Sequence, residues 1–259
     1  MPDAMVKKVD HVLLKTGDAR ALFGLLTEGL GLPTAWPLFH YAGCLSGAVA
    51  LGRVSLEVLQ PLGDSQVREL LAPGTRLIGL AFEPYEVPTA LATLDARGLG
   101  RGPPQEFRNT DGRRWTSVPL EYWAEAPIRL LVKYTWDQDQ RWDTFEAALR
   151  AARGGALGVQ GLDEVVIGVK NAAGVERWSA LLGAADAVGL RPWKPAQGPA
   201  LRVEPASRDG MISLVLTVAD VRAAAAELER RNLLACDEGE EIQLRLTSDQ
   251  EMTLRLRQR

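Results

Sequence analysis

The sequence predicts an α+β fold assembled from four βαβββ modules that are arranged in two pairs. The same order of elements, a strand, a helix and then two or three further strands, occurs four times along the 259 residues. A polar segment that becomes Ala/Arg-rich and then Gly-rich, over 137–160, separates the second copy from the third. We therefore expect one paired domain over 1–137, a linker with a helix over 138–157 and a second, degenerate paired domain over 158–259.

The first two copies carry clear strand and helix signals. Asp18 can accept hydrogen bonds from the free N–H groups of a helix that ends near Gly31. Pro88 suits the first turn of a helix, because its missing N–H would be unpaired there anyway. The predicted strands are 9–14, 44–51, 54–60, 77–82, 115–123 and 128–134, and the predicted helices are 18–29 and 87–97.

The third and fourth copies repeat this order. Gly183 ends the helix of the third copy, whose later strands are short and weak, and Asp220 begins an alanine-rich helix in the fourth. The last two strands alternate apolar and polar residues, as half-buried strands do. The predicted strands are 162–169, 191–193, 201–204, 211–218, 242–246 and 252–256, and the predicted helices are 172–182 and 221–231.

Composition excludes several classes of protein. The net charge of −3 offers no basic field for nucleic acid, and no apolar run approaches the roughly 20 residues of a membrane span. The first residues lack the apolar core of a secretory signal, which predicts a cytoplasmic protein. Cys44 and Cys236 are too few for a disulfide framework and form no CxxC motif.

Short motifs in these copies resemble the vicinal oxygen chelate superfamily, which includes glyoxalase, bleomycin-resistance and extradiol dioxygenase proteins. The resemblance covers nearly the whole chain and depends on the order and spacing of the motifs. It implies curved mixed sheets that form two clefts, with the helices on the outside. The motifs are Val9-Asp10-His11-Val12, Leu30-Gly31-Leu32, Leu56-Glu57-Val58, Gly79-Leu80-Ala81-Phe82-Glu83 and Leu162-Asp163-Glu164-Val165.

The resemblance also implies a divalent metal held by the first and last strand of each module. His11 and Glu57 match two of these four ligand positions, whereas Gly79 and Leu131 stand at or near the other two and have no donor atoms. The corresponding positions of the second half carry no ligand set. They are Glu164, Arg202, Ser213 and Arg255.

Alternation along the strands places Glu57 on the cleft face and His11 on one face with Leu13 and Lys15. His40 precedes a strand that lines the same cleft and is a candidate third ligand or substrate contact. Two alternatives stay open for the cofactor. His11 and Glu57 hold a divalent metal ion, or no metal binds and they form a hydrogen-bonded pair.

Three further residues are candidates for substrate binding. Arg129 and Lys133 share a strand face and could hold an anionic or oxygen-rich ligand, or simply face water at the sheet edge. Trp115 could form an aromatic wall for a flat ligand, or fill an ordinary core.

The sequence therefore predicts a glyoxalase-like small-molecule-binding protein with its cleft in the first half and an incomplete metal site. One alternative is a metal-dependent lyase, isomerase or dioxygenase that acts on a small oxygenated substrate. Another is a non-catalytic module for antibiotic sequestration or for dimerisation. The expected partner is a small molecule, with no nucleic acid or membrane, and such modules also commonly pair across chains as homodimers.

Overall fold

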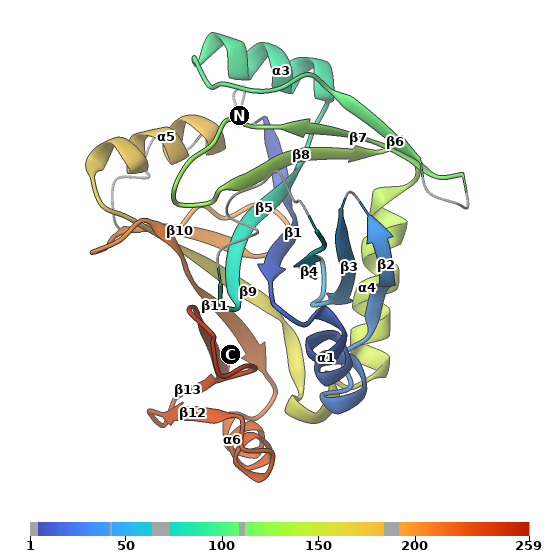
Figure 1. Cartoon of the computed structure of the whole chain (residues 1–259), viewed down its shortest axis with the longest axis vertical. Helices are drawn as coiled ribbons and strands as arrows, with labels where there is room; N and C mark the ends of the chain where they lie inside the picture. Colours follow the sequence, from blue (N-terminus) through green and yellow to red (C-terminus); the bar gives the residue numbers. More distant parts are fainter. Residues whose placement is uncertain (1–4, 42, 64–72, 109–111, 184–191, 259) are drawn as a thin grey trace.

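The computed structural model describes residues 5–41, 43–63, 73–108, 112–183 and 192–258. These residues form two curled mixed sheets of eight and six strands, with the helices at the periphery (Figure 1). The predicted α+β class is confirmed. None of the helices in the described ranges has the length and apolar character that crossing a lipid bilayer requires.

The N-terminal half forms the eight-stranded sheet, in the order β2-β3-β4-β1-β5-β8-β7-β6. Strands β1 and β5 meet antiparallel at its centre, and each pairs in parallel with the last strand of its own module. The sheet thus joins two modules edge to edge. Its strands are β1 Val6–Lys15, β2 Thr34–Tyr41, β3 Cys44–Ala50, β4 Ser55–Pro61, β5 Arg76–Pro84, β6 Gln105–Arg108, β7 Arg114–Pro119 and β8 Ile128–Tyr134.

The C-terminal half repeats this plan in a shorter form, with the order β10-β9-β11-β14-β13-β12. Of the predicted strand 191–193, residue 191 lies outside the described residues, and Trp193 makes only an isolated bridge to Leu201. The strands are β9 Val159–Val169, β10 Ala200–Pro205, β11 Gly210–Val218, β12 Leu234–Asp237, β13 Glu241–Leu244 and β14 Thr253–Gln258.

Helices α1, α4, α5 and α6 begin where the sequence provides a side-chain acceptor for their first N–H groups, whereas α3 has no such cap and carries Pro88 in its first turn. Asp18 accepts from Ala21, and Asp220 accepts from Arg222 and Ala223, so both predicted caps are confirmed. The helices are α1 Ala19–Gly24, continued by the π-helical turn η1 Leu25–Gly29, then α3 Val87–Ala96, α4 Gln138–Ala151, the 3-10 turn η2 Gly155–Leu157, α5 Ala172–Leu182 and α6 Val221–Arg230.

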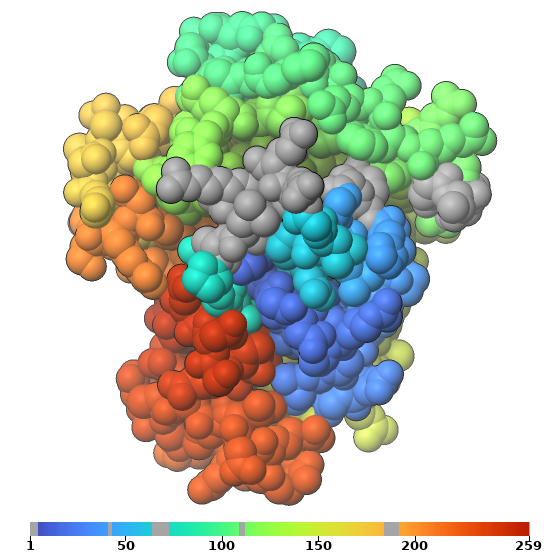
Figure 2. All heavy atoms as spheres, in the orientation of Figure 1, coloured from blue at the N-terminus to red at the C-terminus, as the bar shows by residue number. Residues whose placement is uncertain are grey.

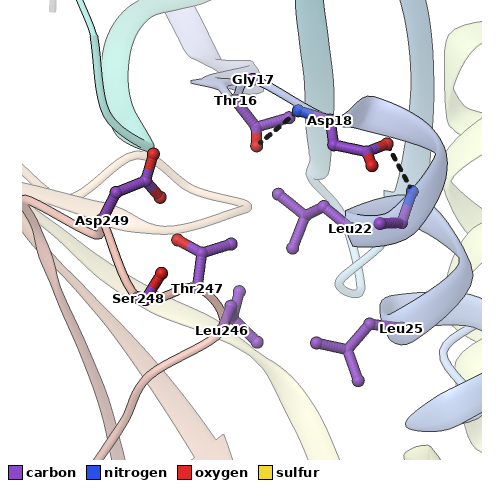
Figure 3. A pocket seen from close by; sticks show the side chains of 10 residues that line it. Thr16, Gly17, Asp18, Leu22, Leu25, Leu246, Thr247, Ser248 and Asp249 are labelled. Carbon is purple, nitrogen blue, oxygen red and sulfur yellow. Dashed lines mark hydrogen bonds between the residues drawn. The ribbon is translucent and has the colours of Figure 1, made fainter.

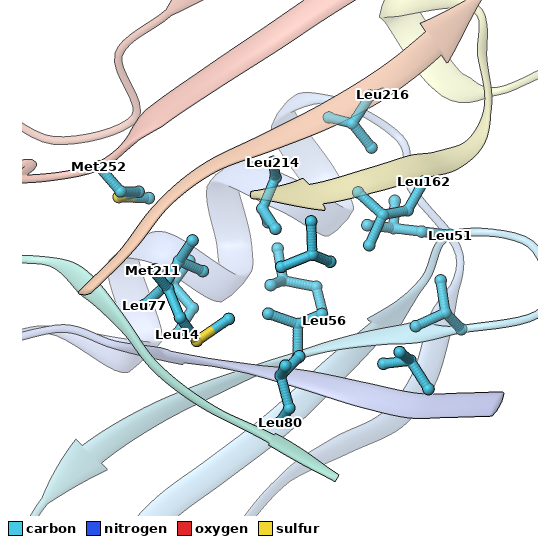
Figure 4. Close-up of a cluster of buried hydrophobic side chains, with 14 of the residues drawn as sticks. Leu14, Leu51, Leu56, Leu77, Leu80, Leu162, Met211, Leu214, Leu216 and Met252 are labelled. Atoms are coloured by element: carbon cyan, nitrogen blue, oxygen red, sulfur yellow. The ribbon is translucent and has the colours of Figure 1, made fainter. Parts of the chain in front are cut away.

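One apolar core joins the two halves. Leu14, Leu56 and Leu80 of the first sheet pack toward Leu214 and Leu216 of the second (Figure 4). Figure 2 shows blue segments near the N-terminus in contact with red segments near the C-terminus in the lower part of the molecule. Each sheet uses one face for this core, so its opposite face does not take part in the contact between the two halves.

A β-bulge occurs at the same place in the first strand of every module. The register of each central pair of strands shifts at three points, and two of these shifts leave an unpaired residue at equivalent places, one in each strand. The extra residues are Asp10 in β1, Ile78 in β5, Asp163 in β9 and Ile212 in β11. A bulge turns two consecutive side chains toward one face, which regular alternation forbids.

Candidate ligand-binding site

The bulge in β1 places Asp10 and His11 on the same face of the N-terminal sheet. This face, which we call the inner face, also carries Leu13 and Leu59, and it is opposite the core shared with the C-terminal half. Asp10 is fully buried and His11 is nearly so. Two ionisable groups are therefore buried side by side near the centre of the sheet.

His11 contacts Glu57, as the alternation along β4 predicts. Its Nε2 lies 3.2 Å from Oε2 of Glu57, and the other carboxylate oxygen accepts a hydrogen bond of 2.6 Å from Ser46. The side chains of His11 and Glu57 are only 8% and 12% exposed. The structure thus brings the two predicted residues side by side.

Asp10 supports His11 from the opposite side of the ring. Its Oδ1 lies 2.7 Å from Nδ1 of His11 and accepts a hydrogen bond of 3.2 Å from the Tyr134 hydroxyl, while Oδ2 forms a 3.0 Å ion pair with Arg141. Burial opposes the charge of this carboxylate, but Arg141 and His11 outweigh that effect and hold its pKa well below the usual range. Asp10 is therefore an anion at neutral pH.

The two carboxylates determine the charge of His11. Burial disfavours the imidazolium ion, but hydrogen bonds to Asp10 and Glu57 favour it more strongly and raise the pKa of His11 to about 9. At neutral pH both ring nitrogens carry protons, so His11 donates to a carboxylate on each side. In this form the imidazole has no lone pair with which to accept a proton or bind a metal.

Helix α4 covers part of the inner face, and sequence reasoning missed its contribution. Arg141 of this helix reaches Asp10, and the adjacent Trp142 is fully buried, with the Lys8 ammonium 3.5 Å from the centre of a Trp142 ring. Burial lowers the pKa of Lys8 to about 7. The segment predicted as a linker thus contributes side chains to the site.

One rule relates the ligand position on the first strand of each module to that on the last strand. The last-strand residue pairs with the residue two places after the first-strand position. In the first module that position is His11, and Glu57 pairs with Leu13. In the second module this residue is Leu130, which pairs with Ala81, two places beyond Gly79. Leu131, proposed from the sequence, instead faces the shared core and is fully buried. The correction moves the position by one residue and still supplies no metal donor.

The same rule identifies two polar pairs in the C-terminal half. Glu164 forms an ion pair with Arg202 at 2.6 Å, and Ser213 accepts a hydrogen bond of 2.8 Å from Arg255. These four residues are those that the sequence assigned to the ligand positions. In the structure they form one pair in each module, an ion pair in the third and a hydrogen-bonded pair in the fourth.

The prediction that His40 lines the cleft is wrong. His40 pairs with Leu45, which packs into the shared core, whereas Phe39 pairs with Ser46 on the inner face. Strand β2 has register shifts on either side of Trp36, so simple alternation from its ends gave the wrong face. His40 is exposed and makes no third ligand for His11 and Glu57.

Arg129 and Lys133 also lie on the wrong face for the predicted role. They alternate with Tyr134, whose hydroxyl marks the inner face of β8. Arg129 is buried with its guanidinium carbon 3.6 Å from the centre of a Trp123 ring, and burial lowers its pKa to about 9. Lys133 donates to the Tyr85 carbonyl at 2.6 Å. Both side chains share the face of β8 that carries Leu131 and donate hydrogen bonds to nearby backbone carbonyls.

Aromatic side chains are the other main feature of the inner face. Trp115 pairs with Tyr134 across the ladder, and its ring stacks on Phe107 with centroids 5.5 Å apart. On the opposite wall, Trp36 meets His11 edge to face at 5.9 Å, and Phe39 is 41% exposed. Trp115 was predicted, but Phe107 of β6 and the aromatic residues of β2 were missed because these strands carry weak apolar alternation.

The donor set does not fit a catalytic divalent metal, which normally takes three protein ligands. The described residues include no group of three or more His, Cys, Asp and Glu side chains that could hold such an ion. A Cβ atom at Gly79 would lie 2.0 Å from the Ile128 carbonyl oxygen, so the backbone leaves no space for a ligating side chain there. Of the four ligand positions in the N-terminal half, only those of His11 and Glu57 carry donor side chains, and these two side chains bind each other.

Comparisons with known proteins identify the fold. No protein-family profile and no curated protein matches the sequence. Among solved structures, a hypothetical protein from Staphylococcus aureus matches with a TM-score of 0.68 at 11% identity, over 97% of this chain and 99% of that one.

Two enzymes match over the whole of this chain. A mutant of 4-hydroxymandelate synthase from Streptomyces coelicolor has a TM-score of 0.66 at 15% identity, with 93% of its own chain covered. Homoprotocatechuate 2,3-dioxygenase from Arthrobacter globiformis has a TM-score of 0.59 at 11% identity, with 81% covered. Identities this low establish architecture and leave the reaction open. The chain therefore has the vicinal oxygen chelate fold, with two pairs of modules in tandem, as its repeated motifs predict.

Proposed function

We propose that this protein binds a small, flat, largely aromatic molecule on the inner face of its N-terminal sheet, without a catalytic metal. The proposal is carried by one arrangement. Aromatic side chains form walls from β2 and β7, and the polar residues beside Trp36 are already bonded to one another. Such a surface offers area for stacking and few groups for chemistry.

The state of the polar groups favours binding over catalysis. The two N–H groups of the His11 imidazolium donate to Asp10 and Glu57. Glu57 also accepts a hydrogen bond from Ser46, and Asp10 forms an ion pair with Arg141. A general base needs a free lone pair and reach to a substrate proton, and the charged form of His11 has no such lone pair. The network instead fixes the shape and charge of one wall.

The named relatives suggest the kind of ligand. Two of them are named for 4-hydroxymandelate and homoprotocatechuate. Both are hydroxylated phenyl acids, and a ring of this size suits stacking between aromatic side chains. For this chain we propose the same class of aromatic ring as ligand and no particular reaction.

Tryptophan fluorescence tests the proposal directly. The protein is titrated with 2-naphthol and, separately, with homoprotocatechuate, and saturable quenching gives the Kd. We expect Trp36→Ala and Trp115→Ala each to weaken binding about fivefold, because each removes one stacking contact of about 1 kcal/mol. Trp193→Phe, in the C-terminal half, is the control and should leave the Kd unchanged. Affinities that neither inner-face variant alters would overturn the proposal.

Metal analysis separates this proposal from the metal-dependent alternative. Protein purified without chelator is analysed for bound transition metals, together with a His11→Ala variant. We expect substoichiometric metal in both. A stoichiometric ion that His11→Ala removes would contradict metal-free binding and would favour a lyase, isomerase or dioxygenase.

A further inference from the structure

A cavity separate from the inner face lies where the two halves of the chain meet. Its volume is about 380 Å³, and it opens between helix α1 and the loop 246–249 (Figure 3). Volumes of about 300–1,000 Å³ at the junction of two structural units are typical of small-molecule sites. Nothing in the inner-face network contributes to this cavity.

Hydrogen bonds fix both walls of the cavity. The Thr16 hydroxyl accepts from the Asp18 amide at 3.3 Å and contacts the Thr75 hydroxyl at 3.1 Å, which in turn donates to Asp249 at 3.0 Å. The backbone of Thr75 also bonds to that of Asp249. One short network therefore connects the N-terminal rim, at Asp18, to the C-terminal rim, at Asp249.

The cavity is lined by an apolar surface and by an acidic rim. Leu22, Leu25 and Leu246 form an apolar surface, and Asp18 and Asp249 place carboxylates on the rim (Figure 3). Among the described residues, those that line the cavity include no Arg, Lys or His.

The rim carboxylates keep accepting capacity for a ligand. Asp18 uses one oxygen to accept from the Ala21 amide at 2.9 Å. The pKa of Asp249 is lowered chiefly by the Thr247 hydroxyl and also by that of Thr75, with a smaller contribution from Lys15. Lys15 does not line the cavity, and its Nζ donates to the Gly74 carbonyl at 2.9 Å. A hydrogen-bond donor with positive charge complements such a rim, and hydrocarbon complements the leucines.

We propose that this junction cavity binds a small primary amine with a hydrocarbon body, with its ammonium at the Asp18 and Asp249 rim and its hydrocarbon on the leucines. The site is independent of the aromatic ligand proposed for the inner face. An amine bound there would also contact both halves of the chain at once. Its binding would therefore raise the free energy of unfolding.

Three probes of equal length test the charge preference. Calorimetric titrations with hexylamine, hexanol and hexanoate share one hydrocarbon body and differ in the head group. We expect hexylamine to bind at least tenfold more tightly than hexanol, and hexanoate not to bind. Asp18→Asn with Asp249→Asn should abolish the preference for the amine and leave hexanol binding unchanged, since Asn also serves as a helix N-cap.

A steric variant tests the location. Ala21 lines the cavity and is exposed, so Ala21→Trp should fill the space without disturbing the core, and Arg20→Trp on the same helix is the matched control. We expect only Ala21→Trp to abolish hexylamine binding, with circular dichroism unchanged in both variants. Equal affinities for the three probes, or hexylamine binding that survives Ala21→Trp, would overturn the proposal. Trp36→Ala should leave hexylamine binding intact, so failure at one site does not imply failure at the other.

Discussion

The two halves of this protein use one backbone plan in different solvent environments. In the N-terminal half the residues at the module positions, His11 and Glu57, are almost fully buried, and helix α4 packs over them. In the C-terminal half the equivalent arginines, Arg202 and Arg255, are 43% and 29% exposed. The comparison teaches that the fold fixes where such pairs lie, whereas burial decides how much each pair affects stability and pKa.

The largest expected effect comes from removing the partner of Asp10. Arg141→Ala removes one of the two cations beside the fully buried Asp10 carboxylate and leaves only His11, so we expect a loss of about 3 kcal/mol in the free energy of unfolding. Urea denaturation followed by circular dichroism measures it. Arg202→Ala breaks the C-terminal counterpart, in which Glu164 is buried but Arg202 is 43% exposed. Water can replace part of this ion pair, so the loss should be smaller, about 1–2 kcal/mol. Equal losses in the two variants would show that burial does not distinguish the halves.

The next effect is a dependence on pH. Because the folded pKa of His11, about 9, exceeds the ordinary value of 6.5, its contribution is fully present below about pH 6.5 and is lost as the pH rises through 9. A shift of this size corresponds to on the order of 3 kcal/mol. His11→Gln should therefore destabilise the protein more at pH 6 than at pH 10.

The comparison of wild type with His11→Gln at each pH is needed because Lys8 titrates in the opposite sense. Its folded pKa, about 7, lies below the ordinary value, so its contribution to stability improves as the pH rises from 7 toward 10.5. The difference between the two proteins cancels this effect. A destabilisation by His11→Gln that is the same at both pH values would contradict the charged state of His11.

A smaller effect is expected at Gly79. A Cβ atom there would overlap the Ile128 carbonyl oxygen, so Gly79→Ala should force a backbone shift and cost about 1–3 kcal/mol. Thermal unfolding monitors the change, and Ser213→Ala at the equivalent C-terminal position is the control. A neutral Gly79→Ala would mean that β5 and β8 can separate enough to admit a ligating side chain.

Local patterns predicted much of this architecture. Alternation and helix caps are properties of a few neighbouring residues, and they placed the modules, the caps at Asp18 and Asp220, and the contact between His11 and Glu57. The register shifts of β2 could not be predicted in this way, because a bulge depends on the partner strand. They reversed the face of His40. A one-residue error in register likewise exchanged Leu130 and Leu131.

The partners of Asp10 could not be found from the sequence either. In a regular strand Asp10 would face away from His11, and Arg141 is 131 positions away in a segment that resembles a linker. Only the three-dimensional packing of α4 brings them together. Long-range ion pairs of this kind leave no periodic signal in a single chain.

Helix α4 also determines how a molecule could reach the inner face. It begins at Gln138, directly after β8 ends at Tyr134, and it is followed within a few residues by η2 and β9. A helix tethered so closely at both ends, and anchored through Arg141 and Trp142, cannot swing outward without pulling strands from both sheets. Entry and release would therefore take a one-sided route past the exposed ring of Phe39, with the helix acting as a fixed back wall.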